Sequence, residues 1–317
     1  MTMTAWLLLL ASPAAAQMPA FELPINPLRA ARDGGAVAPE PVFTRTVPFP
    51  VEAYDRSKFS AASRRAQAQA RDAWLKDNDD PRVVRFTIPK TKAYFEKVLE
   101  RLIAGSGLEK AMQAAPLALR VNDSSWGSPS ASMSSGVLRV DPEVAAIMDS
   151  EDEVAAVIAH ELVHHLRAHH EQLLQTVKKH PRTGGGDMFS APVPSKQELE
   201  ARWYHECEAD ALSLRLLANA GYDPSAAADA LRKVKAEVES DPIHGARAGR
   251  GDPTHPSLEV RTEYIARVIA AEKLPSAART RGGLDEVHAE CAARTRGGPG
   301  DEPASEIYRH YKTVKKP

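Results

Sequence analysis

Two histidines and a glutamate are grouped in the segment His160-Glu161-Leu162-Val163-His164. Residues four apart lie on one face of a helix, so both imidazoles can bind the same metal ion. The glutamate follows the first histidine and can take a proton from a water that the metal activates. The spacing H-E-x-x-H therefore predicts a Zn²⁺ site with His160 and His164 as ligands and Glu161 as the general base.

The neighbours of this motif favour a buried helix over a chance match on a surface helix. Five positions around it that a surface helix would fill with charges are apolar: Ile158, Ala159, Leu162, Val163 and Leu166. Ser150 and Glu153 form a capping box, which predicts that the helix begins at Glu151. No residue from there to His170 predicts a break in the helix.

A catalytic zinc site keeps three protein ligands, and His170 is one candidate for the third. It follows His164 by six residues, as in the pattern H-E-x-x-H-x-x-G-x-x-H, but Arg167 replaces the glycine at which that chain turns. A helix that continues to His170 carries its ring away from the metal. We therefore interpret His165, His169 and His170 as a solvated helix surface.

Glu206 is the other candidate, and the one that we favour. It lies in the segment 205–210, about three turns inside a helix that the capping box of Ser195 and Glu198 begins. This depth argues against a role for the acids as simple partners of the helix dipole. Glu206 completes a His₂Glu site, and Asp210, one turn on, can accept the second N–H of a ligand histidine and fix its tautomer.

The elements that must position these residues are helices and a small sheet. Strands are predicted at 83–88, 117–121 and 137–140, and Ala131–Ser134 is a further candidate strand at the sheet edge. A helix follows Thr91 with one apolar face, another begins after Asp223, and a last one runs from Thr254 to Lys273. These segments predict a mostly helical α+β domain over residues 81–274.

The composition and the two ends of the chain limit the class of protein. The 317 residues carry a formal net charge of −1, which gives no general attraction to nucleic acid. Mean hydropathy is −0.37, and no stretch is apolar enough to span a bilayer.

Residues 1–16 contain a short apolar core and an Ala-x-Ala cleavage site, which predict a signal peptide and a periplasmic or secreted protein. Residues 17–80 are predicted as a Pro/Ala-rich linker and an exposed helix, and residues 275–317 as a low-complexity tail. Whether Cys207 and Cys291 form a disulfide stays open.

Together the motifs resemble those of one peptidase family. H-E-L-x-H, then E-x-E-A-D, then Leu-Leu-Ala-Asn-Ala-Gly-Tyr-Asp-Pro224 and Thr-His-Pro-Ser257 are similar to the gluzincin peptidases of the HtpX and CAAX-prenyl-protease type, which include soluble exported bacterial members. The resemblance covers about residues 91–273 and implies a zincin-like domain with an active-site helix, a small edge β-sheet and a second ligand-bearing helix.

The resemblance also implies roles for individual residues. His160, His164 and Glu206 would bind one zinc, Glu161 would be the base, and Asp210 would support a ligand histidine. His255 falls in the family's downstream His-Pro motif with Arg261 behind it, so both are candidates near the metal or substrate. Many members have Asn-Ala before the edge strand over the cleft, and Ser130-Ala131 stands in that place here.

The expected function is therefore an exported zinc endopeptidase that acts on proteins or peptides, with envelope protein quality control as the role that the family suggests. The edge strand would bind an extended substrate by strand addition. Tyr204, Tyr264, His255 and Arg261 all stay candidates for the donor to the oxyanion. The loop around Gly184–Gly186 is either a gate over the cleft or a plain linker. A latent zinc-binding module that works as a chaperone or adaptor is the alternative, and the sequence does not indicate an oligomeric state.

Overall fold

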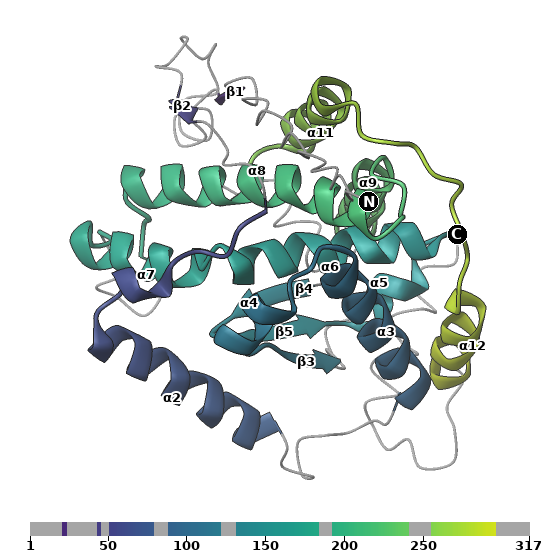
Figure 1. The fold of residues 1–317 in the computed structure, drawn as a ribbon, viewed down its shortest axis with the longest axis horizontal. Helices are drawn as coiled ribbons and strands as arrows, with labels where there is room; N and C mark the ends of the chain where they lie inside the picture. Colours follow the sequence, from purple (N-terminus) through teal and green to yellow (C-terminus); the bar gives the residue numbers. More distant parts are fainter. Residues whose placement is uncertain are drawn as a thin grey trace, which may run out of the picture.

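The computed structural model describes residues 21–23, 43–45, 51–78, 88–121, 131–183, 192–240 and 255–295. These residues are mostly helical with one three-stranded sheet, which confirms the α+β prediction (Figure 1). The strands are β1 (Phe21–Leu23), β2 (Phe43–Arg45), β3 (Ala118–Val121), β4 (Ala131–Ser134) and β5 (Val137–Val140). The helices are the short η1 (Arg56–Lys58), α2 (Ala61–Asn78), α3 (Pro89–Gly105), α4 (Glu109–Ala114), α5 (Pro142–Ala146), α6 (Glu151–Leu166), α7 (His169–Lys179), α8 (Lys196–Asn219), α9 (Ala226–Ser240), α11 (Leu258–Glu272) and α12 (Leu284–Thr295).

The three-stranded sheet has the order β3-β5-β4, so β4 lies at an edge, as predicted. β3 runs parallel to β5 and β4 runs antiparallel to it, with Ala131 opposite Val140. The middle strand is buried, with Leu138 and Val140 fully inaccessible to solvent. Both β4 and β5 contact α6, so the sheet edge is held against the helix that carries the H-E-x-x-H motif.

The α6 helix begins where the capping box predicts, because the Ser150 side chain accepts the backbone N–H of Glu153. Its middle packs against α3, α8 and α9, and most of its residues there are buried. Ile158 and Leu162 are fully inaccessible, so truncating Leu162 to alanine would cost about 2–5 kcal/mol. The motif therefore lies on a rigid element of the core.

The prediction that this helix continues unbroken to His170 is wrong. The α6 helix ends at Leu166, Ala168 adopts a left-handed conformation with φ of 56°, and α7 begins at His169. The solvated surface predicted for the following histidines is wrong as well, because His165 and His169 are buried and His170 is half-buried.

A segment upstream of α2 holds this turn in place. The N–H of Tyr54 donates to the Leu166 carbonyl at 2.8 Å, and the Arg167 guanidinium donates to the Glu52 carbonyl at 2.9 Å. Carbonyls at the end of a helix need partners from outside it, and Tyr54 supplies one for Leu166 while the Arg56 guanidinium supplies one for His165. Part of the segment predicted as linker is thus packed on the core, whereas α2 is largely exposed, as predicted.

The C-terminal region also differs from the expected low-complexity tail. The α12 helix packs against α3 and α5, and its Leu284 and Val287 are buried in the common core. Ahead of it, the Thr280 carbonyl accepts the N–H of Glu151 at 2.8 Å, which satisfies the first turn of α6. The ordered domain therefore extends beyond residue 274, and α11 is not its last helix.

Several predictions fall on residues outside the described ranges. These are the signal peptide, most of residues 17–50, nearly all of the strand at 83–88, the loop around Gly184–Gly186 and the tail after residue 295. Within the described ranges, no helix is both long enough and apolar enough to cross a bilayer. Cys207 and Cys291 are both free thiols, which answers the open question of their pairing.

Candidate metal centre

Three metal-binding side chains from two helices converge at one point. The α6 helix contributes His160 and His164, and α8 contributes Glu206. The two Nε2 atoms are 3.1 Å apart, and the carboxylate oxygens of Glu206 lie 3.3 Å from Nε2 of His160 and 3.6 Å from that of His164. The structure thus brings together the three residues predicted as ligands.

The spacing of these donor atoms fits a tetrahedral zinc site. Ligand atoms about 2.0–2.1 Å from one tetrahedral ion stand about 3.3 Å from one another, and the two Nε2 atoms at 3.1 Å are close to this separation. Glu206 approaches the two rings with different oxygens, Oε2 toward His160 and Oε1 toward His164. Both histidines also use Nδ1 for another hydrogen bond, so each Nε2 is directed to the common point. Two imidazoles and one carboxylate are a donor set that zinc prefers.

His160 is held from behind by a buried ion pair. Its Nδ1 lies 3.0 Å from Asp210, whose carboxylate accepts two hydrogen bonds from Arg261 at 2.7 and 2.8 Å. Burial lowers the pKa of His160, but the hydrogen bonds to Asp210 and Glu206 outweigh it and raise the pKa to about 10. Asp210 therefore occupies the position predicted for it, and Arg261 also approaches Glu206 at 3.4 Å.

His164 is held by a chain of residues that the sequence analysis missed. Its Nδ1 lies 2.9 Å from Nδ1 of His169, and Nε2 of His169 lies 2.7 Å from the buried carboxylate of Glu208. Arg167 and Tyr204 both donate to the other oxygen of Glu208, at 3.2 and 3.3 Å. The sequence did carry a signal for this chain, because Glu208 is an acid in the buried part of α8 and needs a partner there.

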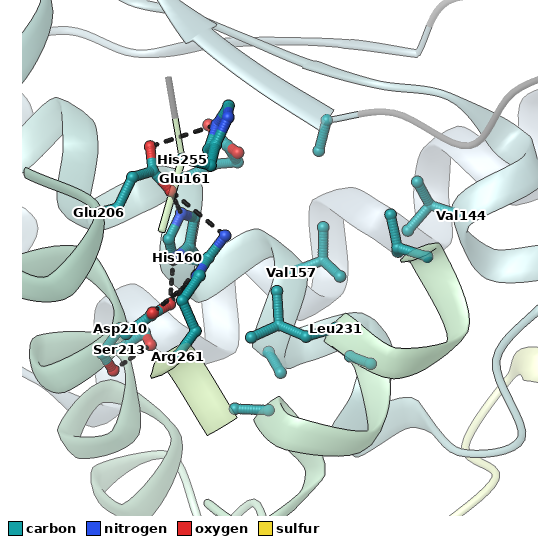
Figure 2. Close-up of a pocket in the computed structure, with 15 residues that line it drawn as sticks. Val144, Val157, His160, Glu161, Glu206, Asp210, Ser213, Leu231, His255 and Arg261 are labelled. Carbon is teal, nitrogen blue, oxygen red and sulfur yellow. Dashed lines mark hydrogen bonds and ion pairs between the residues drawn. The ribbon is translucent and has the colours of Figure 1, made fainter. Parts of the chain in front are cut away.

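Glu161 lies beside the metal-binding residues, in the wall of a cavity of ≈ 270 Å³ (Figure 2). The same wall contains His160, Glu206, Asp210 and Arg261. Burial raises the pKa of Glu161 to about 7, although the positive charge of the neighbouring His160 opposes this shift. A carboxylate with a pKa near neutrality can both accept and release a proton at physiological pH.

The opposite part of the cavity wall is apolar, which the sequence analysis did not anticipate. Figure 2 shows Val144, Val157 and Leu231 away from the cluster of charged residues. These side chains come from α5, α6 and α9, and further apolar lining residues are Ala227, Ala230 and Val234. Their spacing of three or four residues on α9 is the helical periodicity that could have indicated this face.

The remaining predicted site residues have different positions. The His255 side chain is exposed, and its Nε2 lies 3.5 Å from the Glu206 carboxylate. Ala131 of β4 lines the cavity. Of the four candidate oxyanion donors, His255 and Arg261 line the cavity, whereas Tyr204 and Tyr264 are not among the described residues that do so. Tyr264 is buried in the core.

No family model matches this chain, and no curated protein matches it at a significant level.

Proposed function

We propose that this chain is an exported zinc-dependent endopeptidase of the gluzincin type, similar to the HtpX and CAAX-prenyl-protease peptidases in its motifs. One observation carries the proposal: three side chains suited to zinc converge at one point, and two of them, His160 and Glu206, share a cavity wall with Glu161, a half-buried carboxylate whose pKa is raised. Zinc enzymes that hydrolyse peptide bonds combine these same groups.

The chemistry of the proposed reaction divides between the metal and Glu161. A Zn²⁺ ion held by His160, His164 and Glu206 would supply Lewis acidity, which polarises a peptide carbonyl and acidifies water. Glu161 accepts a proton from the attacking water as the C–O bond forms. It then donates this proton to the amine nitrogen as the C–N bond breaks, so the carboxylate is regenerated. His255 and Arg261 are the candidate donors to the developing oxyanion that line the cavity.

The cavity and the sheet edge support an extended peptide as the substrate. The β4 strand pairs with β5 on one side, and its Ala131 reaches the cavity that contains Glu161. An extended chain can therefore add to β4 through backbone hydrogen bonds, which tolerates many side chains. The apolar wall formed by α5, α6 and α9 would take one apolar side chain of the substrate.

Export is part of the proposal and rests on the sequence of residues 1–16. The apolar core followed by Ala14-Ala15-Ala16 supports cleavage after Ala16 and release into the periplasm or the medium. A role in envelope protein quality control follows from the family resemblance alone.

The contact of His255 with Glu206 supports a second candidate, a latent form. Its Nε2 lies 3.5 Å from the carboxylate that would bind the metal, so the ring can compete for the open position that a catalytic zinc needs. A chain that keeps zinc but does not turn over would act as a binding module. In that case His255→Ala would increase hydrolysis of a protein substrate.

Casein hydrolysis by the mature protein from Gln17 tests the proposal. The wild type is compared with Glu161→Gln and with Glu96→Gln, which alters an exposed glutamate of α3, and bound zinc is quantified in all three. Loss of hydrolysis in Glu161→Gln alone, with zinc retained, is the expected result. Hydrolysis by Glu161→Gln would contradict the assigned base, and zinc-loaded wild type without activity would favour the binding module.

A further inference from the structure

Four groups form a continuous hydrogen-bonded chain that leads away from the proposed metal site. It runs from Nδ1 of His164 to Nδ1 of His169 at 2.9 Å, and from Nε2 of His169 to the Glu208 carboxylate at 2.7 Å. Arg167 donates to the far oxygen of Glu208. His169 and Glu208 are 2% and 1% exposed, so water does not substitute for these partners.

The chain allows only one direction of hydrogen bonding when Glu208 is an ionised acceptor. The carboxylate then requires the proton of His169 to be on Nε2, because two lone pairs would otherwise face each other at 2.7 Å. Nδ1 of His169 must then accept, so His164 donates from its Nδ1. This leaves the lone pair of His164 on Nε2, the atom that lies 3.1 Å from Nε2 of His160.

The other ligand histidine has a shorter version of the same arrangement. His160 contacts Asp210 directly, and Arg261 binds that carboxylate. Both carboxylates come from α8 and both are paired with an arginine. We infer that His169 and Glu208 are positioning residues that fix the tautomer and the ring orientation of His164 for metal binding, an inference that rests on the proposed zinc site.

The backbone places His169 for this role. The left-handed conformation of Ala168 breaks the helix directly after α6, and His169, the first residue of α7, contacts His164 in the last turn of α6. His205 of α8 stacks on the His169 ring with centroids 4.2 Å apart and planes 7° from parallel. The ring is therefore fixed on one face by stacking and at both nitrogens by hydrogen bonds.

Glu208→Gln is the sharpest test, because it keeps the size of the side chain. Arg167 and Tyr204 both donate to one oxygen of Glu208, so they select the amide oxygen of the glutamine and leave its NH₂ group facing His169. The NH₂ group donates to Nε2 of His169 and reverses the chain, which moves the proton of His164 to Nε2. We expect about 10- to 100-fold weaker Zn²⁺ binding, measured by competition with a chromophoric chelator, and a switch from Nδ1–H to Nε2–H in ¹H–¹⁵N spectra of metal-free protein.

Two variants of His169 separate positioning from packing. His169→Phe keeps a ring against His205 but removes both hydrogen bonds, so zinc binding should weaken to a similar extent. His169→Asn keeps an acceptor near the position of Nδ1 and should restore most of the affinity, although it loses more of the ring packing. The stability of each metal-free variant is measured by urea unfolding, so that poor folding is not mistaken for poor binding.

The outcomes distinguish this inference from the proposed function. Equal zinc affinity in the wild type, Glu208→Gln and His169→Phe would overturn it, and so would an unchanged tautomer of His164. Zinc binding without casein hydrolysis would contradict the peptidase alone, since the affinity comparison still decides the role of His169 and Glu208. A wild type that binds no zinc would overturn both.

Discussion

Arg261→Met tests how strongly the charges behind the metal site depend on one another. Arg261 and Asp210 are 8% and 3% exposed and share two hydrogen bonds of 2.8 and 2.7 Å. Removing one partner of such a buried pair costs about 3–5 kcal/mol, because the other charge stays in a medium of low polarity. At about 2–4 °C per kcal/mol, the midpoint of thermal unfolding should fall by about 6–20 °C.

Urea unfolding of metal-free protein, followed by circular dichroism, measures this loss. The urea midpoint should decrease with little change of slope. Arg267→Met is the matched control on the same helix, since Arg267 forms an exposed ion pair with Glu263 and should contribute at most about 1 kcal/mol. The double variant Asp210→Asn/Arg261→Met should lose about 1–3 kcal/mol less free energy of unfolding than the sum of the losses of the two single variants.

Comparing the losses of stability in Arg261→Met and Arg267→Met tests whether the buried ion pair of Arg261 and Asp210 forms in solution. Equal losses for Arg261→Met and Arg267→Met would mean that Asp210 is solvated in solution and that the buried pair does not hold His160. Strict additivity of Asp210→Asn and Arg261→Met would also refute it, because a direct contact must appear as an interaction energy.

Three further predictions concern packing, specificity and pH. Gly105→Ala should destabilise the protein by about 1–3 kcal/mol, because its Cβ would lie 2.7 Å from Cα of Ala220. Gly107→Ala is the comparison, since its Cβ meets no atom within 4 Å and it shows the cost of a positive φ alone. A urea midpoint of Gly105→Ala equal to that of the wild type would contradict a close approach of α3 and the end of α8. Ala230→Leu fills the apolar part of the cavity by three carbon atoms at about 0.8 kcal/mol each, so kcat/KM should fall about 60-fold for peptides with a large apolar side chain in that pocket and little for peptides with glycine there; equal losses for both peptides would mean that the pocket does not bind side chains. Peptide hydrolysis should decrease at acidic pH, because burial raises the pKa of Glu161 to about 7 and only its ionised form accepts a proton. The charge of a bound cation lowers this pKa, so the acidic limb of the kcat/KM profile should lie at or below about pH 7. An acidic limb above about pH 7 would exclude Glu161 as the group responsible.

Features that depend on local sequence were predictable. Ser150 and Ser195 each cap a helix through the backbone N–H three residues on, a contact that involves a single turn. The spacing of His160 and His164 likewise fixes their relative positions within one helix. Placing Glu206 beside them needed the packing of α6 on α8, which the sequence indicated only through a second motif.

Features held by distant contacts were not predictable in this way. The turn after α6 has an alanine in a left-handed conformation, where glycine is the usual signal. The carbonyls of His165 and Leu166 before it accept hydrogen bonds from Arg56 and Tyr54, more than a hundred positions earlier in the chain. The α12 helix has the composition of a low-complexity segment, yet it packs on α3 and α5 through buried Leu284 and Val287, and its Glu290 accepts hydrogen bonds from Thr91. In both places tertiary packing overrides the local preference.

The middle of α8 shows how such contacts can still be inferred from the sequence. Residues 205–210 are buried, yet three of them are acids. Glu206 and Asp210 share one face, whereas Glu208 lies on another, so no single partner can serve all three. A buried carboxylate needs a hydrogen-bonded or charged partner. His160 and Arg261 each contact both Glu206 and Asp210, whereas Glu208 has its own partners, Arg167 and His169. The faces on which buried acids lie therefore predict where partners must converge on a helix, and here the second face carries Glu208, whose partner His169 positions His164.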